Sequence, residues 1–169
     1  MRDLEKLARS ISDTLSSEFF TKVNVGIGTP VVGVKDLARS FKEAQTALEV
    51  GKVFDTDKNI VSYDNLGIAR LIYHLPTTLC ETFLKEVFKK NSIESLDHET
   101  LFTIQKFFEN SLNVSETSRK LFVHRNTLVY RLDKIKKLTG LDLREFDHAI
   151  IFKIALMVKK YLAANPTKF

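Results

Sequence analysis

Residues 115–138 constrain the fold of this chain more than any other segment. Within this segment, apolar residues recur at spacings of four, three and three, which is typical of one buried face of an α-helix: Leu128, Leu132, Ile135 and Leu138. Only the three residues 122–124 separate this helix from a shorter one predicted over 115–121. A gap that short forces a tight turn between helices. The pattern therefore predicts a helix-turn-helix, with its second and longer helix over 125–138.

The same spacing divides the motif into an inner and an outer face. We expect its core to consist of Ser118, Leu121, Val123, Leu128, Leu132 and Ile135. Ser115 is the expected N-cap of the first helix, because its hydroxyl can accept a free backbone N–H. Phe122 stands where many helix-turn-helix proteins have Gly, so we expect a turn without a left-handed residue at that point.

The outer face carries side chains suited to double-stranded DNA. Arg can bond in a bidentate manner to guanine and Asn to adenine, and in such motifs the start of the second helix faces the base edges. The residues expected to read bases are therefore Arg125, Asn126, Thr127 and Arg131. The residues expected to contact the DNA backbone are Ser115, Thr117, His124, Tyr130, Lys134, Lys136 and Lys137. For His124, capping of the second helix is an equal alternative.

The charge distribution supports this interpretation. Residues 98–169 hold 13 Lys and Arg against 7 Asp and Glu, a net charge of +6, whereas residues 1–97 hold 13 against 14, a net charge of −1. Within 119–137 there are seven basic residues and one acid, Asp133. A basic cluster alone is more often a solvated surface, so a plain helical hairpin remains the structural alternative. The coincidence of turn, core spacing and charge in one segment favours DNA.

The rest of the chain predicts a mostly α fold with a small α/β part. Six Gly and three Pro in 169 residues are typical of a largely helical chain. Apolar periodicity predicts helices over 3–19, 35–50 (with Gly51 as its C-cap), 67–75, 78–90, 98–112 and 145–163, and strands over 22–28 and 59–63. Asp142 and Glu145 form the pattern of a capping box for the last helix.

This order indicates three parts. Residues 1–76 form an α/β domain, residues 77–95 a connecting helix and linker, and residues 96–169 an all-helical DNA-binding domain. Two strands are few for an independent sheet, so further strands are expected from outside these residues or from a partner chain. The broad apolar surface of the last helix lies either at the centre of its domain or against a second chain; a homodimer would suit palindromic operators.

A resemblance to a known family gives this architecture a name. The segment 116–143, and above all LFVHRNTLVYRL at 121–132, resembles the C-terminal helix-turn-helix of the purine-catabolism (PucR) and carbohydrate-diacid (CdaR) regulators. Residues 25–52 and 60–76 resemble the degenerate, here truncated, GGDEF-like domain of the same proteins. The resemblance implies a sequence-specific activator of catabolic genes, whose small-molecule effector is sensed by a domain absent from this chain. The single cysteine and the charged first residues, which lack the apolar core of a signal peptide, predict a cytoplasmic location. Ser118 departs from the Ala that is usual in the family.

Other function classes find little support in the sequence. The GGDEF signature loop is absent, and Asp36, Asp55, Asp57 and Asp64 lack metal-binding spacing, so we expect no enzyme, catalytic residue, metal or cofactor. We interpret Gly26-x-Gly28 as a strand-ending turn and Cys80 as a buried apolar residue. No apolar run is long enough to span a membrane. Two alternatives remain: a basic helix that grips an acidic protein partner, and a nucleotide-binding GGDEF-like domain.

Overall fold

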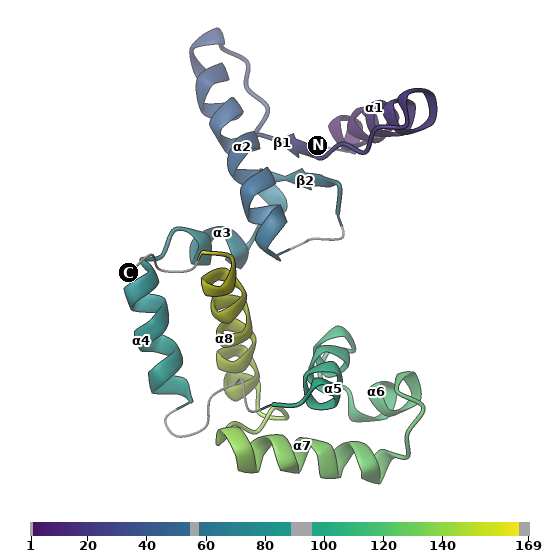
Figure 1. Cartoon of the computed structure of the whole chain (residues 1–169), viewed down its shortest axis with the longest axis vertical. Helices are drawn as coiled ribbons and strands as arrows, with labels where there is room; N and C mark the ends of the chain where they lie inside the picture. The colour runs from purple at the N-terminus through teal and green to yellow at the C-terminus, as the bar shows by residue number, and fades with distance from the viewer. Residues whose placement is uncertain (1, 55–57, 89–95, 166–169) are drawn as a thin grey trace. The chain divides into compact units, whose positions relative to one another are not determined.

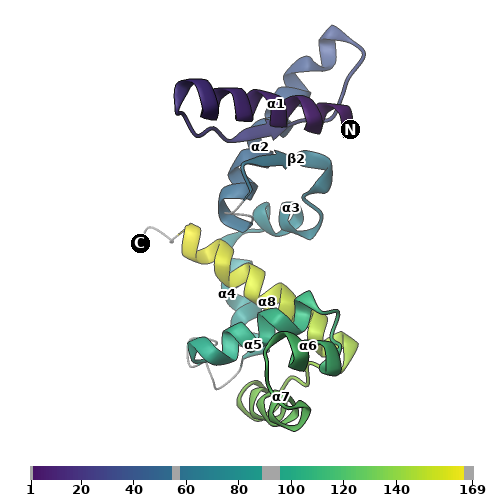
Figure 2. The ribbon, with the colours of Figure 1, turned by 90° about the vertical axis from the view of Figure 1, so that its right-hand side faces the viewer.

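The computed structural model describes residues 2–54, 58–88 and 96–165 and confirms a mostly helical fold with a small α/β part (Figures 1 and 2). The chain divides into two compact units: Met1–Thr77 with Lys160–Phe169, and Thr78–Lys159. Helix α4 (Thr77–Val87) lies almost entirely in the second of these units. The predicted linker that follows this helix, residues 91–95, lies outside the described residues.

The first unit is built around a two-stranded parallel sheet. Its elements are α1 (Arg2–Phe19), β1 (Val25–Ile27), α2 (Leu37–Phe54), β2 (Ile60–Ser62) and α3 (Ile68–Tyr73), with 3₁₀ turns η1 (Val34–Asp36) and η2 (Tyr63–Asn65). Val25 of β1 lies opposite Ile60 of β2. Parallel neighbours need a crossover connection, and α2 supplies it.

Three glycines allow α2 to approach this sheet closely. A Cβ on Gly26 would lie 2.3 Å from the carbonyl oxygen of Ala44, and one on Gly28 would lie 2.0 Å from that of Ser40. Gly51 lies inside α2, where a Cβ would meet the side chain of Val61 at 2.7 Å. The predicted C-cap at Gly51 is therefore wrong, and Gly26 lies within β1 and not in a strand-ending turn. These glycines serve packing between elements.

The second unit is a helical cluster. After α4 it contains α5 (His98–Glu109), α6 (Val114–Lys120), α7 (Arg125–Thr139) and most of α8 (Phe146–Ala164). Residues of α5, α7 and α8 and of the segments beside them form its buried core: Phe88, Leu96, Ile104, Phe107, Leu128, Leu132, Ile135, Leu143, Phe152 and Ala155. Helices α4 and α6 pack against this core through partly buried residues, among them Phe83, Val87 and Val114. The burial of Phe152 and Ala155 places one face of α8 inside this core. Within the described residues, no helix is both long enough and apolar enough to cross a membrane.

The ends of α5 and α7 carry clear caps. The carboxylate of Asp97 accepts a hydrogen bond from the backbone N–H of Thr100 at 2.7 Å, and Gly140 adopts a φ of 78° at the end of α7. The capping box predicted before α8 does not form. The Asp142 carboxylate instead binds Arg144, at 2.7 Å from its Nε, and the helix begins only at Phe146.

Candidate nucleic-acid interface

The first helix of the predicted motif, α6, begins at Val114, and its cap lies two residues before the predicted cap residue. The side chain of Asn113 accepts a hydrogen bond from the backbone N–H of Glu116 at 3.0 Å, so Asn113 caps α6 and the prediction of a cap at Ser115 is wrong. Ser115 is exposed in the first turn, where its carbonyl accepts the hydroxyl of Ser118 at 3.0 Å. That bond supplies the partner that a buried Ser118 requires.

The turn between α6 and α7 contains a strained residue. Phe122 has a φ of 55°, and its side chain is 96% exposed. The expectation of a turn without a left-handed residue is therefore wrong. The backbone N–H of Phe122 donates to the carbonyl of Arg119 at 3.1 Å, and that of Val123 donates to the carbonyl of Ser118 at 3.0 Å. These bonds close the C-terminal end of α6, as in left-handed helix caps that usually employ Gly.

The inner face of the motif is well buried. Leu128, Leu132 and Ile135 are 0% exposed, while Leu121 and Val123 pack, partly buried, against the same core. Thr117 is also 0% exposed, and its hydroxyl donates to the carbonyl of Asn113 at 2.7 Å. Thr117 thus faces the protein interior, so the structure does not leave it available for the predicted phosphate contact.

The start of α7 presents the side chains expected to meet base edges. Arg125, Asn126 and Thr127 are all exposed. His124 Nδ1 accepts a hydrogen bond from the backbone N–H of Asn126 at 3.2 Å and so caps α7. Tyr130 is 71% exposed and lies one turn beyond Asn126, on the same outward face.

The basic residues of this segment fall into two groups. Four form ion pairs within their own unit: Arg119 with Glu116, Arg131 with Glu99, Lys134 with Asp97 and Lys136 with Asp142. Three others form no ion pair in the part of the chain that the structure describes: Lys120, Arg125 and Lys137. The uncompensated positive charge is therefore smaller than the sequence count indicates.

Arg144, to which no motif in the sequence points, neutralises the single acid of α7. Its Nη2 lies 2.7 Å from Asp133 Oδ1, and its Nε lies 2.7 Å from Asp142 Oδ1. Its hydrogen bonds to Asp142 also hold the pKa of that buried carboxyl well below its usual range. A single acid in a basic stretch, such as Asp133, indicates that a cation lies nearby. The sequence does not show that this cation is Arg144, 11 residues further along the chain.

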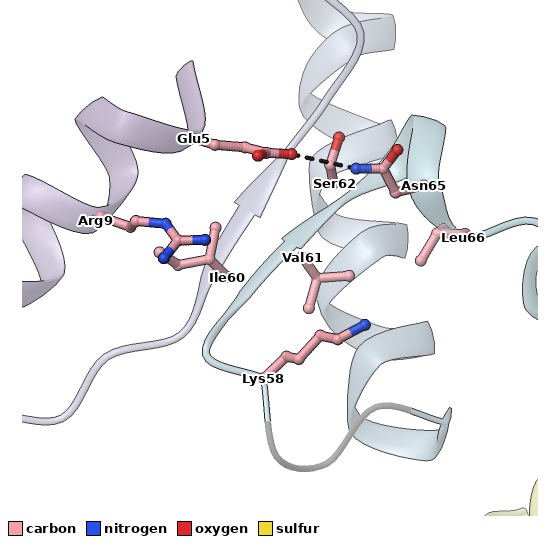
Figure 3. Close-up of a pocket in the computed structure, with 8 residues that line it drawn as sticks. All are labelled: Glu5, Arg9, Lys58, Ile60, Val61, Ser62, Asn65 and Leu66. Carbon is pink, nitrogen blue, oxygen red and sulfur yellow. Dashed lines mark hydrogen bonds between the residues drawn. The ribbon is translucent and has the colours of Figure 1, made fainter. Parts of the chain in front are cut away.

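The first unit contains a cavity of about 200 Å³ along β2, lined by Glu5, Arg9, Lys58, Ile60, Val61, Ser62, Asn65 and Leu66 (Figure 3). Asn65 Nδ2 donates to Glu5 Oε1 across it at 3.2 Å. The described residues include no cluster of three or more His, Cys, Asp or Glu side chains that could hold a metal. Cys80 is 1% exposed, as predicted, and burial raises the pKa of its thiol. The lining of the cavity along β2 carries charges of both signs, from Glu5, Arg9 and Lys58, and so has no clear preference for a phosphate.

Comparison with known proteins agrees with this geometry. Residues 100–158 match the model of the PucR C-terminal helix-turn-helix domain, and residues 1–50 match that of a GGDEF-like domain. The carbohydrate diacid regulator of Escherichia coli (strain K12) is 31% identical over 81% of this chain and 36% of its own length. The purine catabolism regulatory protein of Bacillus subtilis (strain 168) is 26% identical over 88% of this chain and 28% of its own length.

A third relative, the proline-responsive transcriptional activator PutR of Bacillus subtilis (strain 168), is 27% identical over 83% of this chain and 35% of its own length. The chain thus spans about a third of the length of these relatives. All three are named as regulators or activators, in agreement with the prediction that the chain is not an enzyme. The chain is therefore similar over most of its length to PucR/CdaR-type regulators, through a GGDEF-like segment and a C-terminal helix-turn-helix domain.

Proposed function

We propose that this chain is the DNA-binding part of a transcription regulator and that α7 enters the major groove of double-stranded DNA. The observation that carries this proposal is the exposed start of α7, which presents Arg125, Asn126 and Thr127 to solvent. Another face of the same helix is buried in the core, so the orientation of the helix is fixed. The N-terminal end of the second helix is the part of a helix-turn-helix that meets base edges. Arg125 would read guanine and Asn126 adenine.

Contacts to the DNA backbone would come from exposed side chains of the motif: Ser115, His124, Tyr130 and Lys137. Lys134 and Lys136 are also exposed, but they are ion-paired with Asp97 and Asp142 and would reach a phosphate only if those pairs opened. The two interpretations of His124 are compatible with each other. Because its Nδ1 accepts the hydrogen bond that caps α7, the proton of the neutral ring lies on Nε2, which can donate to a phosphate. Capping would thus also orient the donor.

The remaining properties rest on the same proposal. We propose that the complete protein is a cytoplasmic homodimer that activates catabolic genes when a further domain senses a small molecule. A dimer would place two copies of α7 on two half-sites of a palindromic operator. One such motif touches too few base pairs to select a site in a genome.

Selection of genomic fragments by the purified chain, followed by sequencing, tests the proposal directly. We expect one enriched sequence, bound more weakly as the salt concentration rises. Fluorescence anisotropy with that sequence should then show that Asn126→Ala weakens binding roughly 5- to 150-fold, the equivalent of losing about 1–3 kcal/mol. Gln45→Ala, which removes an exposed amide from α2 in the first unit, is the matched control and should bind normally.

Failure to enrich any sequence would contradict the proposal. If the chain bound no duplex above the nonspecific level but retained an acidic protein, the basic helix would serve protein interaction. If a nucleotide raised the melting temperature of the chain and this shift survived deletion of 96–169, the GGDEF-like segment would be a nucleotide-binding domain.

A further inference from the structure

We infer that Arg131 does not read a base but positions α7 by fixing it to α5. This inference rests on the proposed function, because it concerns how the DNA-reading helix is held. Arg131 belongs to a group of four charged residues between the two helices, which we name the α5–α7 clamp: Asp97, Glu99, Arg131 and Lys134.

Within the described residues, the polar contacts of the Arg131 side chain are all with α5. One guanidinium nitrogen, Nη2, is ion-paired with the carboxylate of Glu99, and Nη1 donates to the hydroxyl oxygen of Thr103 at 3.3 Å. Thr103 is 0% exposed, and its own hydroxyl donates to the carbonyl of Glu99 at 2.9 Å. The guanidinium thus spans two successive turns of α5, and the Arg131 side chain is only 26% exposed.

The second pair of the clamp fixes the same flank one turn further along α7. Lys134 Nζ lies 3.2 Å from Asp97 Oδ2. Asp97 is itself held in place, because its other carboxylate oxygen caps α5 through the backbone N–H of Thr100. Two acids from the start of α5 therefore hold two cations three residues apart on α7. This is a repeated contact between the helices and not a single surface ion pair.

The position of Arg131 around the helix also separates it from the outward face. Successive residues of an α-helix advance by about 100°. Relative to the centre of the buried face formed by Leu128, Leu132 and Ile135, Arg131 lies at about 65°, whereas Asn126 and Tyr130 lie at about 150–170°. Arg125 also lies at only about 55°, but it is the first residue of α7 and pairs with no acid within the described residues, so it differs from Arg131 by its place at the open end of the helix. If the DNA groove receives Asn126 and Tyr130, Arg131 lies only at the edge of the groove, where its guanidinium is already paired with Glu99.

A positioning role predicts opposite effects on specific and nonspecific binding. Specific recognition needs α7 in one orientation, so loosening the clamp should weaken it. Nonspecific binding depends on net charge near the phosphates. Removal of the Glu99 charge should therefore leave nonspecific affinity unchanged or raise it. Loss of fold would lower both.

The experiment measures anisotropy of the full chain on the selected operator and on a scrambled duplex of the same length. For Glu99→Gln we expect operator affinity to fall about three- to tenfold while scrambled-duplex affinity does not fall. Glu109→Gln is the matched control: it removes an α5 acid that pairs with Lys106 and has no bond to α7, and it should change neither affinity by more than about twofold. Thermal unfolding of each variant checks that the fold is intact.

A charge swap decides between positioning and base reading. Arg131→Glu alone should lose operator affinity, and the double variant Arg131→Glu with Glu99→Arg should recover it to within about threefold of the wild type. A direct base contact by Arg131 could not be restored in that way. Failure of the double variant to recover although it folds, or a gain of operator affinity in Glu99→Gln, would overturn the inference. If the wild-type chain selected no sequence at all, the proposed function itself would fail.

Discussion

At the scale of single residues, Phe122 is a bulky residue whose backbone adopts the left-handed conformation that favours Gly. A side chain with a Cβ in the left-handed region costs about 1–2 kcal/mol, and Phe122 has almost no burial to offset that cost. The turn geometry is set by the packing of α6 on α7. Phe122 therefore adopts a left-handed conformation that the packing of the two helices requires and that its own side chain does not favour.

Phe122→Gly should consequently stabilise the protein. We expect the free energy of unfolding to rise by about 0.5–1 kcal/mol, because relief of backbone strain exceeds the extra chain entropy of Gly in the unfolded state. Urea unfolding measures this change. Phe122→Ala keeps the Cβ and hence the strain, so it should give no comparable gain; equal stability of the two variants would show that the turn is not strained.

Asp142 is the residue with the clearest dependence on pH. Its folded-state pKa is lowered, first by hydrogen bonds from Arg144 and further by Lys136, so the carboxylate stabilises the fold above its unfolded pKa of about 3.9. This stabilisation is lost as the pH falls below that value toward the folded pKa. Asp142→Asn should cost about 1–2 kcal/mol at pH 7.

Urea midpoints at pH 7 and pH 3 measure this dependence. The midpoint of the wild type should fall more over this interval than that of Asp142→Asn, which has no carboxylate to protonate. Asp13→Asn, on the exposed side of α1, should keep the wild-type slope. Parallel pH profiles for the wild type and Asp142→Asn would contradict the assignment.

At the scale of elements, the contact between α2 and β1 depends on the absence of side chains. A Cβ on Gly28 would overlap the backbone of α2 at Ser40, and backbone atoms cannot move aside as a side chain can. Gly28→Ala should therefore separate the helix from the sheet and cost more than about 2 kcal/mol. Denaturant unfolding of the full chain measures the loss.

Gly33→Ala provides the matched control for this substitution. A Cβ at Gly33 would meet only the Asp36 carboxylate at 3.4 Å, which is an ordinary contact, and its φ of −95° suits any residue. We expect its stability to stay within about 0.5 kcal/mol of the wild type. A similar loss in both variants would mean that the effect of Gly28→Ala is not caused by overlap with α2.

At the scale of the whole molecule, ion pairing within the protein lowers the charge available to DNA. Of seven basic residues in 119–137, four are paired, which leaves Lys120, Arg125 and Lys137. If Lys120 and Lys137 meet phosphates while Arg125 reads a base, the slope of log K against log salt concentration should be about −2 per chain. A slope near −6 would instead show that the ion pairs open when DNA binds.

Lys137→Gln should make that slope shallower by about one unit per chain, because one neutralised phosphate releases about 0.9 counterions. Lys42→Gln, an exposed lysine on α2 of the first unit, should leave it unchanged. Anisotropy titrations between 50 and 300 mM salt, roughly the range in which such slopes are resolved, provide the measurement. An unchanged slope for Lys137→Gln would exclude this residue from the DNA contact.

The sequence by itself determined the elements and the inner face of the helix-turn-helix. Helical periodicity is a local property, because the positions of Leu128, Leu132 and Ile135 on one face follow from the geometry of a single helix. The same holds for the two strands, whose apolar runs end close to β1 and β2. The boundaries were less accurate where a cap decides them, since Asn113 and Ser115 are both good capping residues in sequence.

Only the tertiary structure decided which charges face outward. Arg125 and Arg131 look equivalent in the sequence, yet Arg131 meets Glu99, 32 residues away, and Arg125 meets no acid within the described residues. The same contrast separates Thr117, which packs inward, from Thr127, which is exposed. Periodicity places a side chain on a face of its own helix, but the neighbouring helix decides whether that face is buried, paired or open. The helix-turn-helix was thus visible in the sequence, whereas its reading surface is a product of packing against α5 and of the pairing of Asp133 with Arg144.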